Sequence, residues 1–421
     1  MATAPASGFY YGWAIVGLTF STQFLMTGCV FYGFSVVLTS LADEFAGGDR
    51  TPVIAVQAIG GVAGMVCAPV VGRLMGRGHE RRLITAGALA AGLALLGASR
   101  ATALWQIAAL FGTLIGLASH TLSATGPSTL VVHWFERRRA TALATSQLGS
   151  SLGGMVMAPV VASLIAWGGW RGAYQVLGTL LLCTAPLLWW LVVGRPEDRG
   201  LRVDGLPAQA LDDVAPALEV VPPFRTADAL HEPNLWLIAL AMGIAFMATT
   251  AVISHVVAFG SDAGFEPARA AVLASLMAGG AALGKLVFGR LSDLIGPRPA
   301  LMLALVGQAC GIVALIHVTA FASSVAAVLV TGVSAGGYMP LTTALLARAF
   351  GRRAFGPMMG LLWPIAAPFQ LSGPVLAAWV HDVTGDYAGA FWLFVVGLFA
   401  ALLLVRAIRL PEVEPGLREG L

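Results

Sequence analysis

Long windows without a single charged residue constrain this chain more than any other feature. The first 42 residues contain no Asp, Glu, Lys or Arg, and ten further windows share this property. A helix needs about 20 apolar residues to cross a bilayer, and in lipid a helix satisfies its own backbone hydrogen bonds. The window 299–347 divides at a polar dip between His317 and Ser324, and the window 270–284 continues past one lysine to Val287. The windows therefore predict twelve membrane-spanning helices, in 1–42, 51–72, 83–99, 101–135, 140–170, 172–194, 233–261, 270–287, 299–347 (two helices), 354–381 and 387–405.

Composition excludes several other classes of protein. Only 11% of the 421 residues are charged, against roughly 25% in soluble domains, so a water-soluble enzyme is ruled out. The net charge of +3 gives no reason to expect nucleic acid as a partner. The four cysteines lie inside apolar windows without metal-ligand spacing, and we interpret them as small buried hydrophobic residues. We expect no cofactor, no metal site and no catalytic site.

The arginines predict the orientation in the membrane. If the N-terminus is cytoplasmic, the inside loops hold 19 arginines and the outside loops hold four. Cytoplasmic loops carry the excess of basic residues, so both termini are expected inside, in the inner (plasma) membrane. The first helix starts at Tyr11 without a basic region or cleavage site before it, which favours a retained span over a signal peptide.

The chain also repeats itself. Gly72-Arg73-Leu74 recurs as Gly289-Arg290-Leu291, and Phe135 before an arginine pair recurs as Phe350 before another, at offsets of 215 to 217 residues. Such a repeat predicts two six-helix halves, residues 1–194 and 232–410. The segment 195–231 between them is rich in proline and is predicted to be a cytoplasmic linker, and 411–421 a cytoplasmic tail.

These residues resemble a known family. The loop from Gly289 to Arg298 resembles the loop signature of the major facilitator superfamily, and Gly72 to Arg82 resembles a degraded copy of it. The first copy has Gly76 where the family usually has Asp. The resemblance therefore implies that the cytoplasmic gate rests mainly on Arg290 and Asp293, with Arg73 in the first half.

Further motifs are similar to those of the monocarboxylate transporter and oxalate:formate antiporter group. They are Tyr11-Gly12-Trp13, the run from Trp134 to Ala140, and Gly168-Gly169-Trp170-Arg171. The resemblance covers the whole chain and implies an all-α membrane transporter of twelve helices in two pseudo-symmetric halves.

Lys285 is the only lysine and the only charge deep within a predicted span. A charge there is costly, so it is expected to face a polar cavity and to have a partner. No predicted span contains Asp or Glu, and the missing anion is therefore interpreted as the substrate. The resembled group places a basic residue here to hold a carboxylate. The alternative is a lysine that extends to the membrane interface.

Other residues are candidates for lining the site. His120 and His255 are titratable groups within spans, with a structural role as the alternative for each. The resemblance adds Tyr32 and Trp363, which match positions where the oxalate:formate antiporter contacts its substrate. It also adds Tyr338, which lies one residue from another such position. Lys285 and His255 are the expected proton carriers, with His120 or the neutral acid as alternatives.

One departure from the resembled antiporter favours a single carboxylate, because its second cation is replaced by Ala366. The acid that the animal relatives carry one turn before the cation at Lys285 is Ala281 here, so proton transfer cannot use it. We therefore expect a monomeric carrier that moves a small monocarboxylate, such as lactate or pyruvate, with a proton. Organic anion exchange is the first alternative and proton-coupled drug efflux a weaker one. A receptor would need a signalling domain, for which the linker and tail leave no room.

Overall fold

The computed structural model describes residues 10–205, 230–262, 264–318 and 320–410. The first half consists of α1 (Tyr11–Leu25), the π-helix η1 (Met26–Tyr32), α2 (Gly33–Phe45), α3 (Thr51–Gly76), α4 (Glu80–Ala98), α5 (Leu104–Leu110), the π-helix η2 (Phe111–Ile115), α6 (Gly116–Leu122), α7 (Thr125–Trp134) and α8 (Arg139–Leu191). Two 3₁₀ turns follow, η3 (Pro196–Arg199) and η4 (Val203–Gly205). The second half consists of α11 (Pro233–Asp262), α12 (Pro267–Ile295), α13 (Pro297–Ile316), α14 (Phe321–Gly336), α15 (Tyr338–Thr384) and α16 (Ala388–Ala407).

Ten stretches of the described residues are long and apolar enough to cross a membrane. Two of these stretches are interrupted where glycine adopts a left-handed backbone, Gly169 in α8 (φ 67°) and Gly351 in α15 (φ 72°). A side chain with a Cβ disfavours this conformation, so each glycine ends one pass and lets the next begin. Each of these two stretches therefore crosses the membrane twice. The ten stretches then correspond to the twelve passes expected from the charge-free windows.

The helices extend beyond those windows and take in charged residues. α4 begins at Glu80, whose side chain is buried, and α2 ends after Glu44. α12 carries Asp293 as well as Lys285. The helices are therefore longer than the charge-free spans, because helical hydrogen bonding continues past the apolar segment. Residues 206–229, which make up most of the predicted linker 195–231, lie outside the described residues, as does the predicted tail 411–421.

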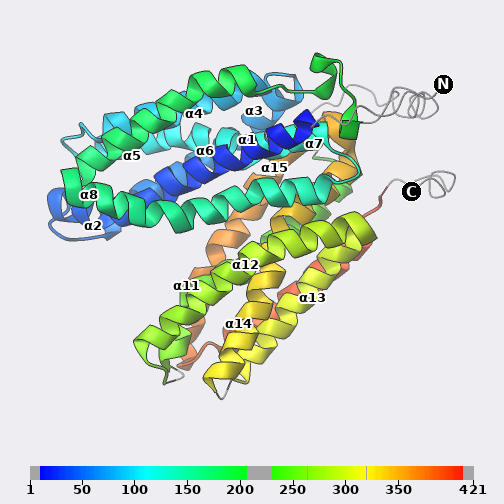
Figure 1. Cartoon of the computed structure of the whole chain (residues 1–421). Coiled ribbons are helices and arrows are strands. Elements are labelled where there is room, and N and C mark those ends of the chain that lie inside the picture. The colour runs from blue at the N-terminus through cyan, green and yellow to red at the C-terminus, as the bar shows by residue number, and fades with distance from the viewer. Residues whose placement is uncertain (1–9, 206–229, 263, 319, 411–421) are drawn as a thin grey trace.

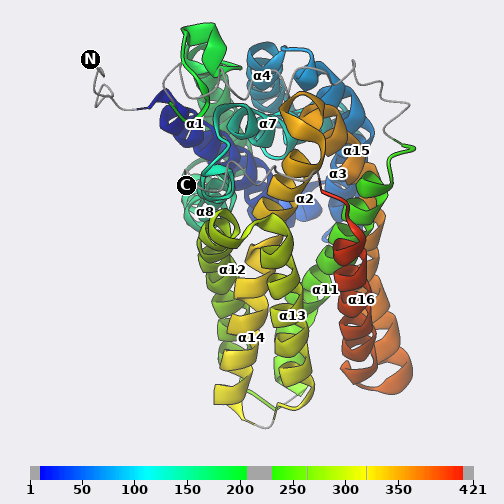
Figure 2. The same ribbon diagram turned by 90° about the vertical axis from the view of Figure 1, so that its right-hand side faces the viewer.

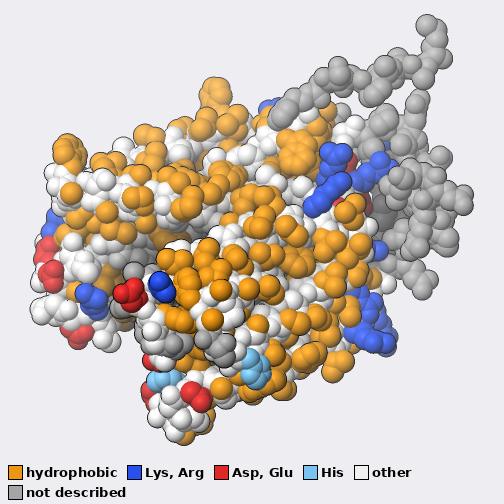
Figure 3. Space-filling view, turned by 60° about the horizontal axis from the view of Figure 1, so that its bottom comes forward, with side chains coloured by type: hydrophobic (Ala, Val, Ile, Leu, Met, Phe, Trp, Pro, Cys, Tyr) orange, Lys and Arg blue, Asp and Glu red, His pale blue; other side chains and the backbone are white. Residues whose placement is uncertain are grey.

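The two halves form a V (Figure 1). They meet at the end of the bundle where α1 begins and α16 ends, which we term the closed end, and they diverge at the opposite, open end. Viewed toward the closed end, the first half lies above and the second below (Figure 2). The surface side chains are distributed between these two ends. Hydrophobic residues cover most of one face, and charged residues gather toward its ends (Figure 3). This distribution is typical of a protein surrounded by lipid.

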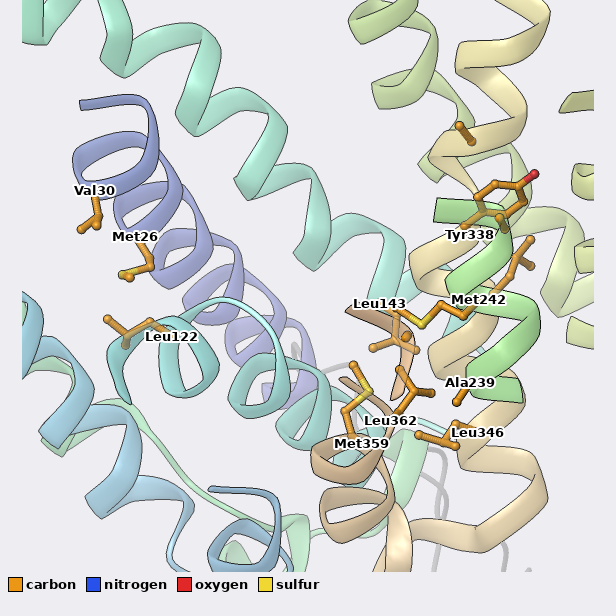
Figure 4. Packing of buried hydrophobic residues seen from close by; sticks show 14 of the residues in the cluster. Met26, Val30, Leu122, Leu143, Ala239, Met242, Tyr338, Leu346, Met359 and Leu362 are labelled. Atoms are coloured by element: carbon orange, nitrogen blue, oxygen red, sulfur yellow. The ribbon is translucent and has the colours of Figure 1, made fainter. Parts of the chain in front are cut away.

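Helix α15 contacts α7 and α8, but the two most extensive contacts between the halves are those of α3 with α15 and of α12 with α8. Between them lies an apolar seal of buried side chains contributed by both halves (Figure 4). We define the seal by Leu143 of α8, Met242 of α11, and Leu346, Met359 and Leu362 of α15. All five side chains are buried from solvent, and we interpret the seal as closing one end of the space between the halves.

Candidate functional site

Lys285 connects the two halves. From α12 its Nζ donates hydrogen bonds to three oxygens of α8, the Gln147 carbonyl at 2.9 Å, Ser150 Oγ at 3.1 Å and Ser151 Oγ at 2.8 Å. An ammonium group has three protons, so these neutral oxygens use its full donor capacity. No carboxylate is among these three acceptors. The charge is hydrogen-bonded but not neutralised, and an incoming anion could take the place of the serine hydroxyls.

Gln147 is a residue of this site that sequence reasoning missed. Its side chain is 4% exposed, and neither Nε2 nor Oε1 has a hydrogen-bond partner among the described residues. It lies four residues after Leu143, so the two side chains share a face of α8 and Gln147 lies next to the seal. A neutral amide in an apolar window gives no charge or motif signal. Only the position of its carbonyl against Lys285 identifies it.

His120 and Trp363 meet across the interface between the halves. Their rings are 6.0 Å apart in an edge-to-face arrangement. His120 lies in the last turn of α6, before a break in the helix, and its Nδ1 lies 3.2 Å from Oγ1 of Thr125 beyond the break. Trp363 Nε1 is buried without a hydrogen-bond partner in the part of the chain that the structure describes. The pair thus presents an indole donor and an imidazole at one contact between the halves.

Tyr32 occupies the last position of the π-helix η1. Its side chain is 48% exposed, and its ring covers Gly154 of α8, where an added Cβ would lie 2.3 Å from a ring carbon. Only glycine lets the aromatic ring approach this closely. π-Helical turns inside α-helices often occur at functional positions, because the extra residue redirects the side chains that follow.

Tyr338 lies within the packing of the second half. It is fully buried, and its hydroxyl donates to Oε1 of Gln308, whose Nε2 donates to Thr249 Oγ1 at 3.0 Å. This chain of hydrogen bonds joins α15, α13 and α11. The structure therefore places Tyr338 in a network inside one half, away from the contacts of Lys285.

His255 is likewise held inside the second half. Its Nε2 lies 3.0 Å from the Pro374 carbonyl and its Nδ1 3.2 Å from the Tyr387 hydroxyl. A carbonyl can only accept, so Nε2 carries the proton and Nδ1 of the neutral ring accepts from the tyrosine. Both nitrogens of His255 thus have structural partners.

The predicted gate residues differ in their contacts. Asp293 accepts from the backbone N–H groups of Ala140 and Thr141, each at 3.0 Å, at the start of α8. A carboxylate is favourable there because a helix N-terminus carries unpaired donors and partial positive charge. Arg290 and Arg73 are exposed. The structure therefore gives Asp293 a contact between the halves, with backbone N–H groups as its partners.

A second polar contact between the halves was not predicted. Arg352 of α15 donates to the His133 carbonyl of α7 and, at 3.4 Å, to Glu197 after α8. His133 Nδ1 lies 3.4 Å from Oε1 of buried Glu80. Nothing in the sequence indicated this cluster, because its members are distant from one another along the chain.

A cavity of about 310 Å³ lies elsewhere, between α1, α4 and the second pass of α8. It is lined mainly by apolar side chains of the first half, and none of the six predicted substrate-binding residues contributes to it. The polar groups that bridge the halves therefore identify the candidate site better than cavity size does.

Comparisons with known proteins agree with this architecture. The family model of the Major Facilitator Superfamily matches residues 18–364 and 238–420. Monocarboxylate transporter 11 of Homo sapiens is 26% identical over 417 residues, covering 94% of this chain and 84% of the relative.

Two solved structures share the fold. The human organic anion transporter MFSD10 (TETRAN) has a TM-score of 0.71 at 15% identity, covering 94% of this chain and 99% of that one. The transporter FucP in the outward conformation has a TM-score of 0.69 at 13% identity, with the same coverage. The chain is similar to relatives named monocarboxylate transporters, and by the match of its family model it belongs to the major facilitator superfamily.

Proposed function

We propose that this protein moves a small monocarboxylate of the lactate or pyruvate type across the plasma (inner) membrane, together with a proton, by alternating access. The carrying observation is Lys285, a cation that bridges the halves through neutral oxygens. The names of the relatives support the substrate class. One cation balances one carboxylate, and Ala366, where the resembled antiporter has a second cation, is buried.

The proposal assigns directions to the two ends. The excess of arginine in alternate loops supports cytoplasmic termini, so the closed end is cytoplasmic and the open end faces outward. Substrate would enter from the open end, bind Lys285 and leave after the seal opens. Asp293 and the α3–α15 contact would then act as the cytoplasmic gate, and a single chain would suffice as a monomer.

Uptake into proteoliposomes tests this function. Purified protein is reconstituted, and uptake of labelled lactate, pyruvate, oxalate and formate is measured with and without an imposed pH gradient. We expect gradient-driven accumulation of lactate or pyruvate. Accumulation of oxalate alone, exchanged for internal formate and insensitive to pH, would identify an anion exchanger and contradict the proposal.

Two substitutions of Lys285 separate binding from proton coupling. Lys285→Ala is expected to abolish uptake in an inserted, folded carrier, whereas Arg82→Ala, which removes an exposed charge, is the control. Lys285→Arg keeps the charge but cannot release a proton at a working pH. If Lys285 carries the proton, this variant loses net pH-driven uptake and retains exchange of internal for external substrate. Full accumulation by the arginine variant would mean that a group other than Lys285 carries the proton, and His120 is then the first candidate.

A further inference from the structure

The amide of Gln147 is a buried polar group of the interface whose hydrogen bonding is incomplete at both of its polar atoms. Both polar atoms of its side chain lack a hydrogen-bond partner among the described residues, although 96% of the side chain is buried. A buried amide without partners is unfavourable, and proteins leave few such groups. When one persists beside a binding residue, the missing partner is a ligand or a water molecule.

Two other buried glutamines show what a structural role requires. Gln23 donates to Ser146 Oγ at 2.8 Å, and Gln308 bonds both Thr249 and Tyr338. These two side chains connect helices within one half. Gln147 differs because its side-chain amide is unused while its own carbonyl accepts the Lys285 ammonium from the other half.

The position of this amide fixes which part of a substrate it meets. Lys285 Nζ donates to the Gln147 carbonyl and to Ser150 and Ser151, which lie within about one turn of Gln147 on α8. A carboxylate that displaces the serine hydroxyls from Lys285 therefore brings its neighbouring carbon toward Gln147. On the other side, the apolar seal begins one turn away at Leu143 and offers no hydrogen bond.

We propose that Gln147 recognises a hydrogen-bonding group on the carbon next to the carboxylate, so that the carrier selects 2-hydroxy and 2-oxo acids over unsubstituted acids. This inference rests on the proposed function. An amide offers both a donor and an acceptor, so it pairs with a hydroxyl and with a keto oxygen. An unsubstituted acid leaves the amide unpaired in the occupied site, and sites of this kind discriminate strongly against analogues that lack the polar group.

Equilibrium binding of matched acids tests the inference. Dissociation constants of lactate, pyruvate, propionate and acetate are measured on the purified wild-type protein, Gln147→Leu and Gln175→Leu. Gln175 is an exposed glutamine of α8, beyond the interruption at Gly169, and serves as the control. We expect wild type and Gln175→Leu to prefer lactate over propionate by roughly 10- to 100-fold. Gln147→Leu should bind the two acids within about threefold of each other, chiefly through weaker lactate binding.

The outcomes separate the inference from the function on which it rests. Equal lactate and propionate affinities in wild type, or an unchanged preference in Gln147→Leu, would overturn the role of Gln147, and a water molecule would then be its partner. Binding of none of the four acids by folded wild-type protein would instead overturn the proposed function. Retained propionate binding reports that Gln147→Leu is folded, and Gln147→Met, with an unbranched side chain, replaces it if it is not.

Discussion

Gly72 of α3 and Gly289 of α12 occupy equivalent positions in the two halves, and each lets its helix approach a helix of the other half. An added Cβ on Gly72 would lie 2.3 Å from the Gly356 carbonyl oxygen, and one on Gly289 would lie 2.5 Å from the Ala144 Cβ. Four residues later the copies differ. Asp293 binds the N-terminus of α8, whereas Gly76 packs against Pro357 of α15.

This difference teaches that one structural motif closes the molecule by two physical means. The α12–α8 contact combines packing with a carboxylate at a helix N-terminus. The α3–α15 contact depends on backbone approach at Gly72, Gly356 and Gly360. Sequence analysis treated the loss of the first acid as a weakness of the gate, but the structure shows close helix packing in its place.

The largest effect is expected at the contact that depends on packing. Gly72→Leu inserts a side chain where the neighbouring atoms are backbone and cannot rotate away, which destabilises the closed end by about 1–3 kcal/mol. The ratio of outward-open to inward-open protein should fall by roughly one to two orders of magnitude. Spin labels at Arg50 and Ala320, at the open ends of the two halves, report this ratio by pulsed distance measurement.

Gly61→Leu is the matched control for this variant. Gly61 lies on the same helix, is exposed, and has no atom within 4 Å of an added Cβ. It should leave the distance distribution unchanged. An unchanged distribution in Gly72→Leu as well would mean that packing at α3 does not hold the closed end.

The second effect concerns the contact made by charge. Asp293→Ala removes the acceptor of two backbone N–H groups at the start of α8, a loss of about 0.5–2 kcal/mol by analogy with helix caps. The same labels should report a smaller shift toward the inward-open form. Asp386→Ala is the control, because Asp386 accepts from the Ala388 N–H within one half. If both variants lower only thermal stability and neither changes the ratio, Asp293 is a cap and not a gate.

The smallest effect is expected from a substitution that restores the missing acid. Gly76→Asp alone is expected to weaken the closed end, because its Cβ would lie 2.8 Å from the Pro357 ring. Pro357→Ala removes that ring and returns a backbone N–H to the facing helix. The double variant should therefore recover outward-open population relative to Gly76→Asp by about 0.3–1 kcal/mol. Equal label distances in the single and double variants would contradict this explanation.

The fold could be predicted because lipid imposes a local requirement on every segment. The longest window divides as expected, since α13 ends at Ile316 and α14 begins at Phe321. The site could be predicted only in part. Lys285 is conspicuous as a lone charge, but the acceptors on α8 follow from tertiary packing. The same packing satisfies both nitrogens of His255, and a charge pattern carries no information about it.

The two contacts of the closed end also differ in how far their attraction reaches. Dispersion between packed atoms loses a quarter to a half of its strength over about 0.5–1 Å, whereas electrostatic attraction declines gradually with distance. When the halves begin to separate, the Gly72–Gly356 contact therefore weakens sooner than the attraction between Asp293 and the end of α8. The opening motion would be asymmetric. Helices α3 and α15 would separate first, and the α12–α8 contact would serve as the hinge.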